Sequence, residues 1–244
     1  MQEDKIFGRN PVLEAIKGGR EIDKLLIKKG EIEGSLREII KKARQSGIVV
    51  TEVDTKKLDA ICEGSNHQGV VAYVATHEYS TVSQILQNAE DKGHAPFIVI
   101  CDKITDPHNL GSIIRTANCA GVDGIIIPKR NSVGLNMVVA KTSAGAVEYT
   151  PVARVTNIAQ TIDALKKEGV WVCGADMDGD EMSKCDLKGA LALVIGSEGE
   201  GISRLVREKC DFLVSIPMMG EINSLNASVA AAVLMYEGVR QRNL

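Results

Sequence analysis

Residues 191–201 read Leu-Ala-Leu-Val-Ile-Gly-Ser-Glu-Gly-Glu-Gly, a continuous apolar run followed at once by a glycine-rich polar loop. An apolar run without alternation is typical of a strand buried on both faces, as in a parallel sheet covered by helices. Similar runs occur at 97–101, 124–127, 171–174 and 212–216. They predict an α/β fold whose sheet is mostly parallel, with helices on both faces.

Helical patterns separate these runs. The predicted helices of this part span 111–120, 137–142, 157–168, 203–208 and 225–241. In the last of them, Leu225, Val229, Ala232, Val233 and Tyr236 recur at helical spacing, which favours a core stripe over the alternative of a subunit interface.

The first part of the chain predicts a smaller α/β unit. Strands are expected at 22–27, 48–53 and 70–75, and helices at 11–17, 35–46 and 56–62. Asn10 is the expected N-cap of the first helix, with Pro11 at its first position. Residues 35–38, Ser-Leu-Arg-Glu, match a capping box that opens the second helix.

A polar stretch between residues 77 and 94 suggests the domain boundary. We therefore expect a first domain at 1–76, a linker at 77–94 with one short helix at 82–89, and a second domain at 95–244.

The composition is that of an ordinary globular protein. The 244 residues are 44% hydrophobic and carry a formal net charge of −3, which argues against non-specific coating of nucleic acid. Residues 1–76 have a net charge of +1 and the remainder −4.

No start resembling a signal peptide and no apolar stretch of membrane-spanning length occur, so a cytoplasmic location is expected. The six cysteines contain no C-x-x-C pair and the four histidines are scattered, so no metal site is predicted.

Three polar clusters follow predicted strands, at 109–115, 196–201 and 223–226. In an open parallel α/β sheet, ligands bind outside the carboxyl ends of the strands. The three clusters are therefore expected to converge on one site.

The glycine loop does not match the phosphate-binding patterns. Its spacing is G-x-x-G-x-G, and no Lys-Ser/Thr follows it. Glu198 would also repel a pyrophosphate. A neutral or positively charged small molecule suits the loop better.

The other two clusters have simpler interpretations as well. Residues 223–226 could provide only the N-cap of the last helix, and Asn109 could be an ordinary turn residue. Arg115 could be a surface arginine, but the apolar residues around it place it beside buried surface. An unpaired guanidinium there would be costly unless it served an anionic ligand or a carboxylate.

The segments NLGSIIRTA (109–117), LVIGSEGEGI (193–202) and IPMMGEINSLNASVAAA (216–232) resemble the three motifs of the SpoU (TrmH) family of RNA ribose methyltransferases, part of the SPOUT superfamily. The likeness covers about residues 97–244. Segments 8–15 and 66–70 resemble that family's substrate-binding domain, which is related to ribosomal proteins that bind kink-turn RNA. The whole architecture is similar to bacterial enzymes that methylate a guanosine ribose in large-subunit (23S) rRNA.

The resemblance implies a trefoil knot in the second domain that holds S-adenosylmethionine, and transfer of its methyl group to a ribose 2′-hydroxyl. The implied cofactor-binding residues are Gly196, Ile216 and Leu225. The implied catalytic residues are Asn109, Arg115, Glu198, Ser224 and Asn226. Because a guanidinium stays protonated in proteins, Arg115 is expected to clamp an RNA phosphate and orient the hydroxyl, with a water or Glu198 taking the proton.

The resemblance also implies RNA as the partner, rRNA ahead of tRNA, and a homodimer. The candidate RNA contacts in the first domain are Arg9, Lys28, Lys29, Lys41, Lys42, Arg44 and His67. The alternatives are a tRNA ribose methyltransferase of the same family, a non-catalytic RNA-binding module that retains the fold, and an oxidoreductase with a degraded nucleotide fingerprint.

Overall fold

The computed structural model describes residues 4–242, and these form two compact units. The first comprises residues up to 78 together with 135–137, and the second comprises 79–134 and the residues from 138 onward. Among the described residues, no helix is long and apolar enough to cross a membrane.

The first unit is a four-stranded sheet with helices on both faces. Its elements are β1 (Lys5–Phe7), α1 (Arg9–Lys17), β2 (Ile22–Lys28), α2 (Ser35–Gln45), β3 (Val49–Val53), α3 (Thr55–Cys62) and β4 (Val70–Val74). The strand order is β1-β4-β2-β3, with β2 and β3 parallel and the other pairs antiparallel. Apolar residues of α1 and α2 pack on one face of this sheet, and Leu58 and Cys62 of α3 pack on the other.

The N-caps predicted for two helices of this unit are wrong. Helix α1 begins at Arg9 after Gly8, so Asn10 is not its N-cap, and α2 begins at Ser35 after Gly34. Neither N-cap residue makes a side-chain capping bond. The Ser35 hydroxyl instead accepts a hydrogen bond from Nη1 of Arg9, at 3.5 Å. A tertiary contact thus replaces the predicted capping box.

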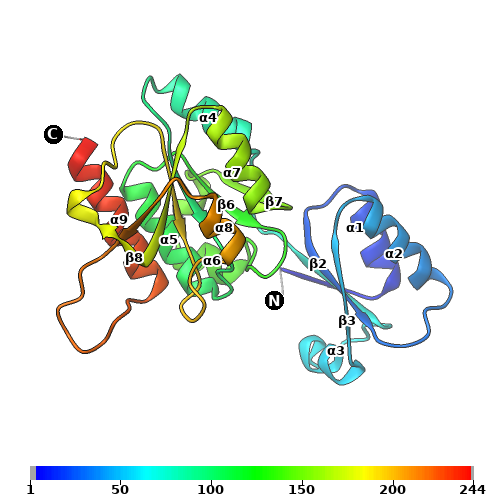
Figure 1. Cartoon of the computed structure of the whole chain (residues 1–244). Helices are drawn as coiled ribbons and strands as arrows, with labels where there is room; N and C mark the ends of the chain where they lie inside the picture. The colour runs from blue at the N-terminus through cyan, green and yellow to red at the C-terminus, as the bar shows by residue number, and fades with distance from the viewer. Residues whose placement is uncertain (1–3, 243–244) are drawn as a thin grey trace. The chain divides into compact units, whose positions relative to one another are not determined.

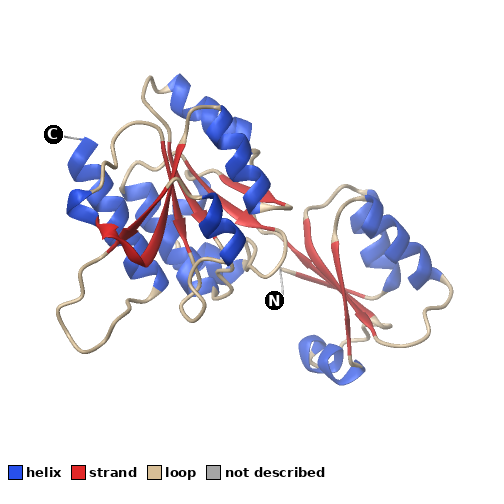
Figure 2. Cartoon of the chain, in the orientation of Figure 1, coloured by secondary structure: helices blue, strands red, loops and turns tan. Residues whose placement is uncertain are grey.

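The second unit is built on a six-stranded, fully parallel sheet. Helices cover both faces of this sheet (Figures 1 and 2). Its elements are α4 (Val82–Asp91), β5 (Phe97–Cys101), α5 (Pro107–Cys119), β6 (Gly124–Pro128), α6 (Met137–Thr142), the 3-10 helix η1 (Ala146–Glu148), β7 (Val152–Val155), α7 (Ile158–Lys167), β8 (Trp171–Glu181), the 3-10 helix η2 (Met182–Lys184), β9 (Leu191–Ile195), α8 (Arg204–Lys209), β10 (Phe212–Ser215) and α9 (Ala227–Arg242). The strand order is β10-β8-β9-β5-β6-β7. The predicted α/β class with a parallel sheet is confirmed.

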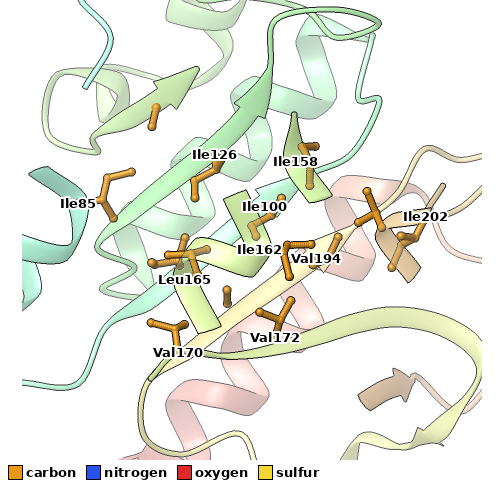
Figure 3. Packing of buried hydrophobic residues seen from close by; sticks show 14 residues of the cluster. Ile85, Ile100, Ile126, Ile158, Ile162, Leu165, Val170, Val172, Val194 and Ile202 are labelled. Atoms are coloured by element: carbon orange, nitrogen blue, oxygen red, sulfur yellow. The ribbon is translucent and has the colours of Figure 1, made fainter. Parts of the chain in front are cut away.

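The core of this unit explains why its strands are apolar without alternation. Isoleucines and valines of one sheet face pack against α4, α7 and α8 (Figure 3). On the other face, α9 lies so close to β5 that a Cβ at Gly238 would meet the Phe97 ring at 2.9 Å. Both faces of the central strands are therefore dry, and neither requires polar residues.

Helix α9 buries a different stripe from the predicted one. Ala227, Ala231 and Leu234 are buried, whereas Val229 and Tyr236 are 47% and 50% exposed. The core interpretation of the stripe through Val229 and Tyr236 is therefore wrong. Sequence periodicity could not distinguish the two stripes, because α9 is apolar around most of its circumference.

Candidate active site

The three polar clusters lie beyond the carboxyl ends of β5, β9 and β10, all of which belong to one parallel sheet. Helix α5 begins with Asp106 as its N-cap, whose carboxylate accepts a hydrogen bond from the His108 amide at 2.8 Å, and with Pro107 in the first turn. Asn109 thus lies in the first helical turn, not in a preceding turn, and it is 8% exposed.

The glycine loop after β9 closes on itself. The amides of Ser197 and Gly201 each donate to the carbonyl of the other, at 3.1 and 2.9 Å. A Cβ at Gly196 would stand 2.1 Å from the Gly201 carbonyl carbon, closer than any side chain tolerates. Gly196 is therefore required by the fold of the loop, in addition to its predicted role towards the cofactor.

Asp102 anchors both ends of this loop, and sequence reasoning missed it. Its amide donates to the Ile195 carbonyl at 2.8 Å, and its Oδ2 accepts from the Ser203 amide at 2.7 Å. The side chain is buried. A carboxylate directly after an apolar strand was the available signal. Nearby, Lys103 pairs with Glu200 at 2.8 Å, and this hydrogen bond lowers the pKa of Glu200.

Asn226 is the N-cap of α9. Its Oδ1 accepts hydrogen bonds from the amides of Ser228 and Val229, at 2.9 and 3.3 Å, and from the Ser228 hydroxyl at 2.6 Å. Capping leaves the amide group of Asn226 free to point elsewhere. The capping interpretation of residues 223–226 is thus correct for Asn226, but it accounts for only half of that side chain.

The side chains of Asn109, Glu198 and Asn226 form a closed triangle. Nδ2 of Asn109 donates to Oε1 of Glu198 at 2.9 Å, and Nδ2 of Asn226 donates to Oδ1 of Asn109 at 2.9 Å. Nδ2 of Asn226 also donates to Oε1 of Glu198. One residue from each cluster therefore meets the other two, as the sequence predicted when it placed the clusters at one site.

A cavity of about 590 Å³ opens beside this triangle. Gly196, Ile216, Ser224 and Leu225 line it, together with Glu198. Three of these five lie after the last strand, so the C-terminal segment supplies much of the wall. The structure thus brings Gly196, Ile216, Ser224 and Leu225, all predicted site residues, around the same cavity as Glu198.

The cavity wall is apolar and acidic, and it includes no Lys, Arg or His among the residues described. The pKa of Asp176 in the wall is lowered: burial opposes its ionisation, but hydrogen bonds from Arg207 and the Asp178 amide outweigh that effect. Asp176 and Glu200 each have a cationic partner, at 2.9 and 2.8 Å. Glu198 has two neutral amides instead. Its negative charge is the one in the wall that no cation balances within residues 4–242.

Sequence reasoning also missed Asp176, because it ended the strand at residue 174, whereas β8 continues to Glu181. The extension carries Asp176 past the edge of the apolar core and into the cavity wall. An apolar run measures only the buried part of a strand, so it could not show this extension.

Arg115 stands apart from the other predicted catalytic residues. It is exposed, it does not line the cavity, and in the described part of the chain it forms no hydrogen bond or ion pair. It lies six residues after Asn109 on α5, about 240° around a helix with 3.6 residues per turn. The expectation that it emerges beside buried surface is wrong, because its apolar neighbours face inward while Arg115 faces solvent.

The predicted RNA contacts divide into two groups in the first unit. Arg9, Lys28 and His67 line one cavity. The others lie elsewhere, with Lys29 beyond the end of β2 and Lys41, Lys42 and Arg44 on α2. Lys42 and Arg44 occupy the last turn of that helix, where a cation also favours the helix dipole.

Comparison with known proteins shows the family of this chain. Residues 96–236 match the model of the SpoU rRNA methylase family, and residues 5–80 match a model described as RNA 2′-O ribose methyltransferase substrate binding. The chain belongs to the SpoU rRNA methylase family. Its relatives include the TrmH family tRNA/rRNA methyltransferase YacO of Bacillus subtilis, which is 49% identical over 99% of this chain and 97% of the relative. A TrmH family tRNA/rRNA methyltransferase of Staphylococcus haemolyticus is 48% identical over 100% and 98%.

Solved structures agree that this chain belongs to the SpoU rRNA methylase family. The SpoU methyltransferase AviRb of Streptomyces viridochromogenes, in complex with S-adenosylmethionine, superposes with a TM-score of 0.61 at 27% identity, over 97% of this chain and 89% of the other. An rRNA methyltransferase of Sinorhizobium meliloti, also bound to S-adenosylmethionine, gives 0.59 at 26% identity, over 97% and 87%. The predictions of an RNA methyltransferase and of S-adenosylmethionine as its cofactor are confirmed.

Proposed function

We propose that this enzyme methylates the ribose 2′-hydroxyl of a guanosine in large-subunit rRNA, and that the Asn109–Glu198–Asn226 triangle is the centre of its active site. The observation that carries the proposal is an unbalanced carboxylate, held by two amides, at the wall of an apolar cavity. A tRNA ribose is the second candidate, because the names of the relatives include both tRNA and rRNA.

The cavity fits S-adenosylmethionine. About 590 Å³ is within the usual range for cavities that bind small molecules. Ile216 and Leu225 offer apolar surface for a flat ring, and an acidic wall without cations suits a positively charged sulfonium. Space is open beside Gly199 and Gly201, where an added Cβ would meet nothing within 4 Å. When bound, the cofactor supplies an electrophilic methyl group.

Glu198 is the proposed proton acceptor. Both amides donate to its Oε1, and within residues 4–242 its Oε2 makes no hydrogen bond. Oε2 can therefore receive the proton of the ribose hydroxyl, directly or through a water, while Asn109 and Asn226 keep the carboxylate from rotating. Ser224, at the same wall, would hydrogen-bond the ribose or the cofactor. Positioning of this kind can supply several kcal/mol of the barrier, on the order of 7–11 in well-oriented cases.

Arg115 is proposed to bind an RNA phosphate and orient the hydroxyl. Its distance from the triangle along α5 fits a homodimer in which one subunit's arginine serves the other subunit's site. The exposed face of α9, with Val229 and Tyr236, offers apolar surface for such an interface. Light scattering that finds only monomers at working concentration would contradict the dimer.

We also propose that the second unit is knotted, because β10 lies at the edge of the sheet while α9 returns to cover β5 in its middle. The first unit would grip bent RNA, as the resemblance to kink-turn-binding proteins implies. A deletion of the first unit that still binds S-adenosylmethionine but no longer binds RNA would support RNA binding by the first unit and cofactor binding by the second.

Ribose-methylation mapping of total RNA from cells with and without the gene tests substrate and reaction together. Loss of one guanosine methylation in 23S rRNA is expected, and loss of a tRNA position instead would favour the second candidate. In purified enzyme, Glu198→Gln should lower kcat by about 10²–10⁴, the usual range for a general base, while the Kd of S-adenosylmethionine stays near that of the wild type. Unchanged turnover would remove Glu198 from the mechanism. Arg115→Lys tests whether the fork of a guanidinium is needed.

A further inference from the structure

A second cavity, of about 470 Å³, lies entirely within the first unit. It is formed where the start of α1, the end of β2, the start of α2 and the loop before β4 meet. The residues that matter for its chemistry are Arg9, Lys28, Ser35, His67, Gln68 and Gly69.

Two half-buried cations line this cavity without an acidic partner. Nε of Arg9 donates to the Gln68 carbonyl at 3.1 Å, and Nη1 donates to the Ser35 hydroxyl at 3.5 Å, so both acceptors are neutral. Within residues 4–242, the ammonium group of Lys28 forms no hydrogen bond or ion pair. No Asp or Glu lines the cavity. The partial loss of water by two positive charges is therefore not offset by a negative charge of the protein.

The surrounding backbone holds both cations in place. Gln68 has a left-handed φ of 48°, and its Oε1 accepts a hydrogen bond from the Arg9 amide at 3.0 Å. Gln68 thus accepts two hydrogen bonds from Arg9, one at the backbone amide and one at the guanidinium. A Cβ at Gly69 would stand 3.0 Å from Cδ of Lys28, so the absence of a side chain there lets the lysine stem lie flat. Rigidly held donors lose little conformational entropy when a ligand binds.

His67 has a structural role rather than a ligand-binding one. The Gly69 amide donates to its Nδ1 at 2.9 Å, so in the neutral ring the proton is on Nε2 and is donated to Asp59, also at 2.9 Å. Both ring nitrogens are used within the protein. The carboxylate of Asp59 is thus bound to His67, and Asp59 does not line the cavity.

We propose that Arg9 and Lys28 form a binding site for a phosphate of the RNA backbone. A guanidinium fork next to an ammonium is the usual combination for a phosphate group. The lining includes no Phe, Tyr or Trp on which a base could stack, and both nitrogens of its one imidazole, His67, are bonded within the protein. The site would therefore position RNA and not read its sequence. This inference rests on the proposed RNA substrate and adds the place where that RNA is held.

The test measures how strongly full-length protein binds a mixture of radiolabelled fragments of total bacterial RNA, by filter retention at several salt concentrations. Arg9→Gln and Lys28→Gln are compared with the matched controls Arg20→Gln and Lys57→Gln, at two exposed cations of the same unit that do not line the cavity. Each cavity variant should weaken binding roughly tenfold and reduce the slope of log K against log salt by about 0.7–0.9, the contribution of one phosphate contact. The controls, which remove equal charge outside the cavity, should change the slope by less than half as much.

Equal slopes for the cavity variants and the controls would overturn the site, as would failure of the wild type to retain RNA. Inorganic phosphate could instead raise the thermal unfolding temperature of the wild type while the cavity variants keep unchanged RNA affinity. That result would assign the site to a free anion and would also overturn the proposed RNA site. S-adenosylmethionine affinity and methyl transfer to the same RNA are measured in parallel. Methyl transfer by the wild type tests the proposed function separately from the slopes.

Discussion

Asn226 has two roles in one side chain, and substitution can separate them. Its Oδ1 caps α9, and its Nδ2 binds Asn109 and Glu198. Serine and aspartate cap helices about as well as asparagine, so Asn226→Ser and Asn226→Asp both retain the capping oxygen. Asn226→Ser removes only the amide donor. Asn226→Asp replaces that donor with a carboxylate facing Glu198.

The expected losses in the free energy of unfolding follow from these contacts. A hydrogen bond to a charged group contributes about 1.5–3 kcal/mol, and the lower end applies because Glu198 is exposed. Asn226→Ser should therefore destabilise the second unit by about 1.5 kcal/mol. Two carboxylates about 4 Å apart repel by about 1 kcal/mol even in bulk water, so Asn226→Asp should cost about 2.5 kcal/mol.

Urea unfolding followed by tryptophan fluorescence measures these values, because the single tryptophan, Trp171, lies in β8 of the second unit. The decisive variant combines Asn226→Asp with Glu198→Gln, which exchanges the amide and the carboxylate. The double variant should recover about 1 kcal/mol or more relative to the sum of the single variants, yet its methyl transfer should stay as low as that of Glu198→Gln alone. Additivity within about 0.5 kcal/mol would refute the contact. Restored activity would refute the need for a carboxylate at position 198.

Three further predictions concern the loop and the pH response. Gly196→Ala should weaken S-adenosylmethionine binding in calorimetry by tenfold or more, because its Cβ would collide with the far side of the loop, whereas Gly220→Ala meets open space outside the cavity and should bind nearly as the wild type does. Asp102→Ala should lower the free energy of unfolding by about 1–3 kcal/mol, since it leaves the half-buried Ser203 amide before α8 without its acceptor. A loss no larger than that caused by replacing an exposed aspartate with alanine would contradict the anchoring role. A hydrogen bond from Arg240 lowers the pKa of Glu237 to about 2 from an ordinary 4.5, so its stabilising effect is complete above about pH 4.5 and is lost as the pH falls through about 2. Thermal unfolding of Glu237→Gln should accordingly converge with that of the wild type at the acid end, and a constant difference down to pH 2 would contradict it.

The fold class and the convergence of the site could be predicted from the sequence because both follow from local patterns. Strands such as Leu191–Ile195 are apolar throughout because each face is covered by helices. Parallel strands end at the same edge of a sheet, so polar residues after β5, β9 and β10 had to lie near each other. The family motifs then indicated Asn109, Glu198 and Asn226, which the structure brings into mutual contact.

Only the tertiary structure decided which side chains face one another. Arg115 and Asn109 share a motif, but helix geometry turns one towards solvent and the other into the triangle. The capping box predicted at Ser35 is absent because Arg9, 26 residues away, binds its hydroxyl. Asp102 and Asp176 matter through partners about 100 and 31 residues distant, respectively. Local spacing specifies elements and their ends, whereas charge balance in a cavity depends on which distant segments pack together.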